Sequence, residues 1–282
     1  MTGGGYSVDR FVERYDTFLI DQFGVLHNGY APFPGAIESL HRLKKLGKSV
    51  LLLSNSGKRS HLNEARLSDL GFPADTYDHF LSSGEVAWHK LKYEYLGKSV
   101  ASDAKCLLLA RDKDRSAVDG LGLQHVDSGA EAEVILIAGS RGDEVELDYY
   151  RNLLTPAVKR KVPCLCTNPD MVMLTKKGLR FGAGKIAQLY DDLGGEVIWI
   201  GKPYREIYEA AYAALGSPDR SSICCIGDSV EHDVAGGGGA GFHTALVLKT
   251  GIHADATQDE LEALFRKHNA YPDHILPDLD SV

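Results

Sequence analysis

Four polar residues stand at the ends of three short apolar runs in this sequence: Asp21, Ser54 with its neighbour Asn55, and Asp228. Short runs that are apolar throughout are typical of strands buried on both faces of a parallel sheet. Because parallel strands present their carboxyl ends at one edge of an open sheet, where ligand sites form, we expect Asp21 and Asp228 to meet at that edge. The pattern therefore predicts a site assembled from distant parts of the chain.

The pairing of Asp21 with Asp228 indicates a bound cation. Two carboxylates with no arginine between them repel each other unless a hard cation such as Mg²⁺ lies there. In the alternative interpretation, each Asp only caps the helix that follows its strand. Either Asp taken alone fits that alternative, whereas three polar strand ends taken together favour a metal-dependent active site.

The segments around these residues resemble the four motifs of the haloacid dehalogenase (HAD) superfamily of hydrolases. Residues 21–26, DQFGVL, are similar to the first motif, Asp-x-Asp-Gly-(Val/Thr). Ser54 is similar to the hydroxyl of the second motif, and Lys202 in Gly-Lys-Pro to the lysine of the third. Residues 227–233, GDSVEHD, resemble the acidic fourth motif, Gly-Asp-x-x-x-x-Asp. All four occur in order, so the resemblance spans nearly the whole chain.

Further details resemble the class IIA branch, which includes nitrophenyl-phosphatase-like and pyridoxal-phosphate-phosphatase-like enzymes. Residues 27–29 (HNG) and 33–36 (FPGA) are similar to the stretch after the nucleophile in that branch. Residues 168–170 (NPD) and 182–184 (GAG) resemble signatures of its cap. The resemblance implies a Rossmann-like core, an α/β cap inserted after the second motif, and a homodimer formed through such caps.

The resemblance also assigns the catalytic and metal roles. Asp21 would attack phosphorus and form an aspartyl-phosphate that water then hydrolyses. Mg²⁺ would be held by the carboxylates of Asp21 and Asp228 and by the backbone carbonyl of Phe23. Asp233 would support the site from outside, by orienting a metal-bound water or Lys202.

The same resemblance assigns the residues that would bind substrate. Ser54 and Lys202 would neutralise phosphoryl oxygens, and both are also counted among the catalytic residues. Asn55 either contacts the phosphate or is structural. In the cap, substrate selection would fall to Asn168, Asp170 and Gly182, although an Asn-Pro-Asp turn explains the first two equally well.

Position 23 departs from the family pattern. Phosphatases of this superfamily usually carry a second Asp there, which protonates the leaving oxygen and later deprotonates water. General acid–base help of this kind is worth about 10²–10⁴ in rate. Phe23 has no proton to give, although its backbone carbonyl remains available to a metal.

Three functional hypotheses follow from Phe23. In the first, the protein hydrolyses small phosphomonoesters that have a good leaving group, or it uses another acid such as Gln22, Glu231 or His232. In the second, it is a dehalogenase-like hydrolase, because halide leaves without protonation. In the third, it is a weakly active or inactive protein that binds a phosphorylated ligand. Lys202, Asp228 and the class IIA features favour the first.

The elements that must position these residues alternate between short apolar runs and helical patterns, as in a doubly wound parallel α/β sheet. The pattern of strand-like and helical segments changes in the middle third of the chain, which predicts an inserted module. We expect residues 1–84 to form the first part of the core, 85–195 the cap, and 196–282 the second part of the core. The expected strands are 17–20, 50–53, 106–109, 134–138, 162–166, 172–174, 197–200, 223–226 and 244–248.

Composition and charge limit the class of protein. The chain has 282 residues, 44% of them hydrophobic, and a formal net charge of −8, which argues against nucleic-acid binding. No window approaches the roughly 18 consecutive apolar residues of a membrane helix, and the first residues lack a signal-peptide pattern. The five cysteines show no zinc-type spacing, so we expect buried thiols in a cytoplasmic protein. The expected partner is a small phosphorylated metabolite.

Overall fold

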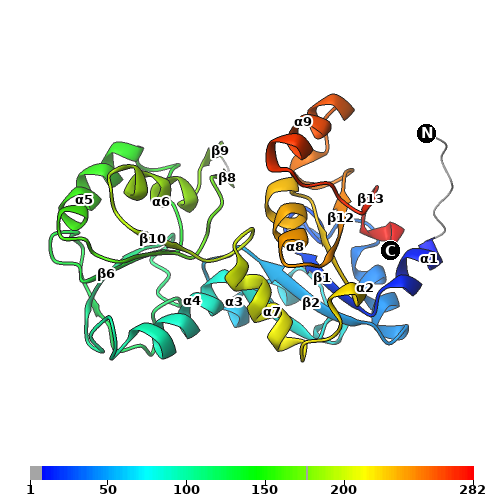
Figure 1. The fold of residues 1–282 in the computed structure, drawn as a ribbon, viewed down its shortest axis with the longest axis horizontal. Coiled ribbons are helices and arrows are strands. Elements are labelled where there is room, and N and C mark those ends of the chain that lie inside the picture. The colour runs from blue at the N-terminus through cyan, green and yellow to red at the C-terminus, as the bar shows by residue number, and fades with distance from the viewer. Residues whose placement is uncertain (1–7, 176) are drawn as a thin grey trace. The chain divides into compact units, whose positions relative to one another are not determined.

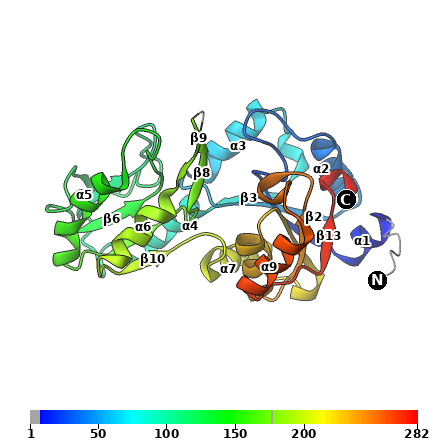
Figure 2. The same cartoon turned by 90° about the horizontal axis from the view of Figure 1, so that it is seen from above.

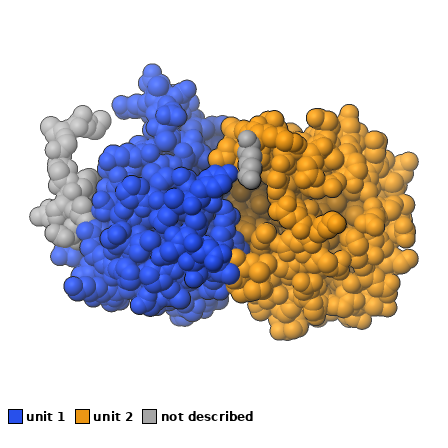
Figure 3. All heavy atoms as spheres, turned by 180° about the vertical axis from the view of Figure 1, so that it is seen from behind, with its two compact units in different colours: residues 1–54, 63–81, 202–282 blue, residues 55–62, 82–201 orange. Residues whose placement is uncertain are grey.

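The computed structural model describes residues 8–175 and 177–282. The chain divides into two compact units, which Figure 3 shows in two colours. The first, here called the core unit, contains residues 1–54, 63–81 and 202–282. The second, here called the inserted unit, contains residues 55–62 and 82–201.

The core unit is built on a six-stranded sheet with the order β13-β12-β11-β1-β2-β3. Strand β1 pairs in parallel with both β2 and β11, and the parallel pairing continues through β12 to β13. The chain order reverses between β1 and β11, which makes this point a topological switch. The strands are β1 (Thr17–Asp21), β2 (Ser49–Ser54), β3 (His79–Ser82), β11 (Ile223–Gly227), β12 (His243–Val247) and β13 (His274–Leu276).

Apolar side chains cover both faces of this sheet. Along β12, Ala245 and Val247 belong to one hydrophobic cluster, whereas Leu246 between them belongs to another. Because neighbouring side chains of a strand point to opposite faces, the sheet lies between two packed layers. This confirms the predicted parallel α/β fold. The helices are α1 (Val8–Arg14), α2 (Ala36–Lys45), α3 (Ser60–Asp69), α7 (Arg205–Ala214), α8 (Gly236–Gly239) and α9 (Gln258–His268) (Figure 1).

The inserted unit has its own parallel sheet, with the order β10-β7-β6-β4-β5. A separate antiparallel hairpin of β8 and β9 precedes α6, and β8 also contacts that helix (Figure 2). The strands are β4 (Lys105–Leu109), β5 (Gln124–His125), β6 (Val134–Ile137), β7 (Cys164–Cys166), β8 (Val172–Thr175), β9 (Gly178–Phe181) and β10 (Val197–Trp199). The helices are α4 (Ser83–Lys90), α5 (Leu147–Lys159) and α6 (Ala183–Asp192).

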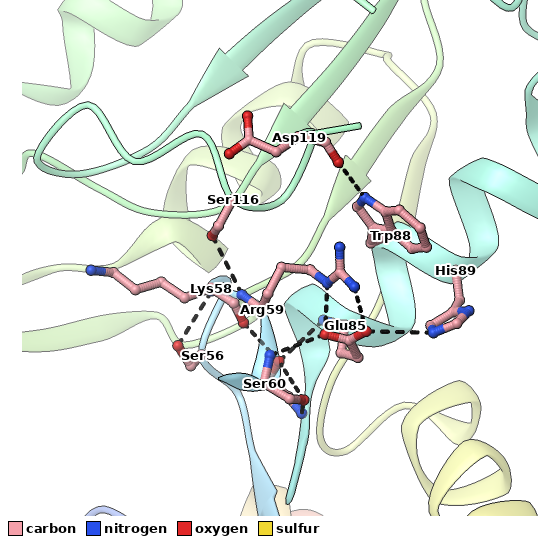
Figure 4. A network of polar contacts seen from close by, with 10 residues as sticks. Ser56, Lys58, Arg59, Ser60, Glu85, Trp88, His89, Ser116 and Asp119 are labelled. Atoms are coloured by element: carbon pink, nitrogen blue, oxygen red, sulfur yellow. Dashed lines mark hydrogen bonds and ion pairs between the residues drawn. The ribbon is translucent and has the colours of Figure 1, made fainter. Parts of the chain in front are cut away.

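Residues 55–62 are tied to the inserted unit by a network of charged groups (Figure 4). Arg59 donates two hydrogen bonds to Glu85, at 2.6 and 2.7 Å, and its guanidinium lies 4.0 Å from the centre of the Trp88 ring. The backbone amide of Ser60 donates to the same carboxylate. The segment that follows β2 is therefore anchored to the start of α4.

Strand β10 lies elsewhere than expected. The sequence assigned residues 197–200 to the second part of the core, but β10 pairs in parallel with β7 in the inserted unit. A three-residue strand of apolar side chains fits either sheet, so its pattern alone does not identify its partner. The longer segment of the inserted unit runs from residue 82 to residue 201, beyond the expected limits of 85 and 195. Residues 55–62, which were expected in the core, also belong to the inserted unit.

Several short elements had no clear sequence signal. Strands β3, β5, β9 and β13 have two to four residues each. The first three residues of β9 are exposed, so no apolar run marks it. All five cysteines are free and buried, as predicted. Among the described residues, no helix is both long and apolar enough to span a membrane.

Candidate active site

Four charged side chains meet at the carboxyl end of the core sheet. Asp21 is the last residue of β1, and Asp228 directly follows β11. Asp233 lies in the short π-helical segment Val230–Ala235, and Lys202 begins the last part of the core unit. One carboxylate oxygen from each Asp lies within 4.8 Å of the others. All four side chains are buried, and Lys202 is only 3% exposed.

Lys202 joins two of the three carboxylates. Its Nζ donates to Asp21 Oδ1 and to Asp233 Oδ1, both at 2.7 Å. The second oxygen of Asp233 accepts a hydrogen bond from the backbone amide of Ser229 at 3.1 Å. Asp233 is therefore held from two sides, and it fixes the ammonium group beside Asp21.

The negative charges of the three carboxylates exceed the single positive charge of Lys202. Burial, together with the charge of Asp233, raises the pKa of Asp21 to about 6 in spite of Lys202. Burial and the charges of Asp21 and Asp233 raise the pKa of Asp228 well above its ordinary value. Three carboxylates and one ammonium sum to a formal charge of −2 (−3 plus +1). A divalent cation would neutralise this charge.

The oxygen donors fit a hard cation. Asp228 has no ion pair in the part of the chain that the structure describes, and only its Oδ2 accepts a hydrogen bond. The carbonyl of Phe23 accepts none from residues 8–175 and 177–282, whereas that of Gln22 accepts two. Carboxylates and a backbone carbonyl are the ligand types that Mg²⁺ prefers. The residues expected to hold Mg²⁺ therefore suit that ion.

Ser54 lies at the end of β2, next to β1. The register places Asp21 opposite Leu53, so Ser54 follows one position along the same edge. Its hydroxyl accepts a hydrogen bond from Gln22 Nε2 at 2.6 Å. Gln22 thus orients the hydroxyl of the second motif.

Phe23 packs against its own loop. Its ring meets the ring of His27 edge to face, with centroids 5.9 Å apart, and 40% of the residue is exposed. His27 is fully buried, and burial together with the charge of Arg66 lowers its pKa to about 4. Neutral His27 is therefore part of the packing of this loop at physiological pH.

The other suggested acids have contacts of their own. The amide of Gln22 has no acidic proton and donates to Ser54. The carboxylate of Glu231 lies 4.0 Å from His268. The backbone amide of His232 donates to Ser229 Oγ, which caps the π-helical segment. Glu231 and His232 do not belong to the carboxylate cluster, the only such group found among the described residues.

Four residues expected to bind substrate gather within the inserted unit. Asn55 Nδ2 donates to Asp170 Oδ1 at 2.8 Å. The amide of Asp170 donates to Asn168 Oδ1 at 3.1 Å, which closes the turn of the Asn-Pro-Asp sequence. A Cβ at Gly182 would overlap the carbonyl of Asp170, so only glycine permits this approach. Asn55, Asn168, Asp170 and Gly182 thus form one polar cluster.

Two residues at the site were missed from the sequence. Gly251 packs against the Asp228 carboxylate, and the amide of Ile252 donates to its Oδ2 at 2.8 Å. Both lie in the loop that follows β12, whose carboxyl end lies at the same edge of the sheet as that of β11. The available signal was a glycine soon after a predicted strand, which is weak because many loops contain one.

A parallel α/β core with aspartates at the carboxyl ends of two neighbouring strands, and a buried lysine bound to one of them, is the arrangement of HAD-type hydrolases. Residues 18–124 match a family model described as haloacid dehalogenase-like hydrolase, and residues 199–282 match a HAD-hydrolase-like model. The crystal structure of a haloacid dehalogenase-like hydrolase from Brucella suis 1330 is 30% identical, with a TM-score of 0.81 over 96% of this chain and 97% of that one. The protein belongs to the haloacid dehalogenase-like hydrolase family.

Two further relatives are phosphatases by name, in agreement with the resemblance to class IIA. A 4-nitrophenylphosphatase of Schizosaccharomyces pombe is 24% identical over 95% of this chain and 93% of its own. A glycerol phosphate phosphatase from Mycobacterium tuberculosis, solved in complex with magnesium, is 23% identical. Its TM-score is 0.71 over 96% of this chain and 77% of that one, which shows a shared fold.

Proposed function

We propose that this protein is a Mg²⁺-dependent phosphatase of small phosphomonoesters that works through an aspartyl-phosphate on Asp21. The observation that carries the proposal is the buried cluster in which Asp21 lies beside Asp228 and shares Lys202 with Asp233. A fixed nucleophile and a fixed cation suit phosphoryl transfer, where positioning and charge neutralisation supply most of the catalysis. The surplus of negative charge favours a bound metal ion.

In the first step, an Asp21 oxygen forms a bond to phosphorus as the bond from phosphorus to the leaving oxygen breaks. In the second, water attacks the acyl phosphate, which releases inorganic phosphate and restores the carboxylate. Lys202 holds Asp21 in place and neutralises phosphoryl oxygens, and Ser54 donates a hydrogen bond to one of them. Asp233 keeps Lys202 charged and oriented.

Asp21, Asp228 and the Phe23 carbonyl would hold Mg²⁺. The ion would offset the surplus charge of the carboxylates and polarise a phosphoryl oxygen. This assignment is supported by the chemistry of the donor set and by Asp228, whose carboxylate has no ion pair with any other described residue.

Phe23 restricts the substrates in this proposal. Without an acid two residues after the nucleophile, the enzyme depends on leaving groups that are stable as anions or that take a proton from water. A sugar phosphate or cofactor phosphate with such a leaving group is the substrate class that we favour. Asn55, Asn168, Asp170 and Gly182 would select its remaining part.

The test is phosphate release from a panel of esters whose leaving groups differ in pKa, with Mg²⁺ and with a chelator. Asp21→Asn should abolish release, because an amide is not a nucleophile. Asp16→Asn is the matched control, since Asp16 lies just before the other end of β1 with its side chain 81% exposed. Release that persists in Asp21→Asn would refute the proposed nucleophile.

The main alternative is a protein that binds a phosphorylated ligand with little or no turnover. Phe23 is the observation that favours it, since the usual general acid is missing. No release from any ester, combined with thermal stabilisation by phosphate in the presence of Mg²⁺, would support that function. We further propose a cytoplasmic homodimer. The five free, buried cysteines agree with a reducing compartment.

A further inference from the structure

Asp228 is enclosed by backbone from two loops of the core unit. Gly24 follows β1 with φ +89°, and Gly251 follows β12 with φ +79°. A Cβ on either glycine would overlap Asp228 Oδ2. Side chains rarely adopt such φ values, and glycine adopts them at no steric cost. Both loops therefore approach this carboxylate too closely to leave room for a side chain.

The second loop also provides a hydrogen bond to Asp228. The amide of Ile252 donates to Asp228 Oδ2 at 2.8 Å. A main-chain donor is fixed by the fold of its loop, whereas a side-chain donor can rotate away. Within residues 8–175 and 177–282, no group donates to the other oxygen, Oδ1. The loop thus engages one oxygen and leaves the second without a protein donor.

Such support is needed because the neighbours of Asp228 repel it. Asp21 and Asp233 are both close, and Lys202 pairs with them rather than with Asp228. A carboxylate without support would rotate away from two like charges. In the same loop, the buried Thr250 Oγ1 has no hydrogen-bond partner in the described chain.

We infer that the segment from Thr250 to Ile252 is a positioning element of the cation site, which fixes the orientation of Asp228 before the cation binds. The inference rests on the proposed Mg²⁺ site. Gly251 sets the position of the carboxylate through contact, and Ile252 selects the oxygen that remains available. Neither residue contributes a side chain to the cation.

The first experiment compares Gly251→Ala with Gly216→Ala by calorimetric titration of chelator-treated protein with Mg²⁺. Gly216 has nearly the same backbone conformation, φ +78°, but no atom lies within 4 Å of its Cβ position. Both variants strain a left-handed residue, and Gly251→Ala should lose the more thermal stability, because its Cβ would also overlap Asp228. Only Gly251→Ala should weaken Mg²⁺ binding, by roughly 10- to 100-fold, as expected for residues that orient metal ligands.

A second pair of variants tests the hydrogen bond. Ile252→Pro removes the amide, and Ile252→Ala retains it while removing the same side chain, which is 61% exposed. The proline ring would lie where the amide hydrogen of residue 252 now points at Asp228 Oδ2, so this variant replaces the hydrogen bond by a steric contact. The proline variant should bind Mg²⁺ at least several-fold more weakly than the alanine variant. If Gly251→Ala does not fold, this pair alone tests whether the loop positions Asp228.

Equal Mg²⁺ affinities within both pairs, with wild-type protein binding normally, would overturn the positioning role and leave the proposed cation site intact. Wild-type protein that takes up no Mg²⁺ would refute the cation site and the inference together. The binding measurement needs no substrate, so it separates both results from a failure of the proposed phosphatase activity.

Discussion

Replacing Lys202 by Met tests whether the buried ammonium holds the carboxylate cluster together. Lys202 is 3% exposed and makes two ion pairs of 2.7 Å. The variant would leave three buried carboxylates with no cation among them. Removing one partner of a buried ion pair typically costs about 3–5 kcal/mol, because the remaining charge is uncompensated. At about 2 °C or more per kcal/mol for a protein of this size, the melting temperature should fall by at least about 6 °C.

The loss should depend on pH in a defined direction. Burial already raises the pKa of Asp21 from 3.8 to about 6, so the folded protein binds more protons than the unfolded chain between these values. Stability linked to Asp21 therefore rises as the pH falls through this window. Without Lys202, which lowers the pKa of Asp21, the window extends to higher pH. The variant should therefore lose more stability at pH 8 than at pH 5.

The assay is thermal unfolding in buffer that contains a chelator, at pH 5 and at pH 8. Circular dichroism monitors the unfolding. Lys249→Met is the matched control, because Lys249 is 68% exposed and makes one ion pair of 3.1 Å, with Asp278. An exposed pair contributes about 0–1 kcal/mol. A Lys202→Met variant that loses no more stability than this control, or loses the same amount at both pH values, would refute the reasoning.

Three other changes test separate parts of the structure. Phe23→Asp should raise the rate of hydrolysis of esters with poor leaving groups, up to about 10²-fold, and should leave the rate with good leaving groups nearly unchanged. Parallel assays on both types of ester check this prediction. Equal effects on the two types would mean that another acid already protonates the leaving group. Mg²⁺ should raise the melting temperature more at pH 7.5 than at pH 5, because protons compete with the metal ion for Asp21, whose pKa is raised to about 6. A thermal shift assay measures this difference, and the opposite trend would contradict a metal site made of carboxylates. Glu85→Gln should destabilise the protein by about 1.5–3 kcal/mol at pH 7, because Arg59 loses its charged partner. Hydrogen bonds from Arg59 and Ser60 lower the pKa of Glu85 in spite of burial, so the effect should disappear as the pH falls below that lowered pKa. Denaturant titrations at a series of pH values from 7 downwards would reveal this.

The meeting of Asp21 and Asp228 could be predicted because it depends on strand ends. Both follow apolar runs that are buried along their whole length, and a parallel sheet brings such ends to one edge. Lys202 was found through its motif, which was expected after a core strand at residues 197–200, whereas that strand pairs within the inserted unit. Functional side chains that lie at the ends of regular strands can therefore be predicted from the sequence.

The division of the chain into units was harder to predict from the sequence, because it depends on which strands pair with each other. Strand β10 carries the same kind of apolar residues as the core strands, yet it pairs with β7. The choice between two parallel sheets is decided by three-dimensional packing, and a run of three apolar residues carries no information about it. The anchoring of residues 55–62 through Arg59 and Glu85 likewise joins segments whose charges look like ordinary surface residues in the sequence.

The contacts of Asp228 show why motifs describe a site incompletely. The groups that hold this carboxylate are the amide of Ile252 and the bare backbone of Gly24 and Gly251. A backbone amide is present at nearly every position, so residue type gives no hint that this one is used. Only the two glycines leave a trace, because a close approach with positive φ excludes other side chains. Substitutions at Gly251 should therefore act on the cation site, although no side chain there takes part in it.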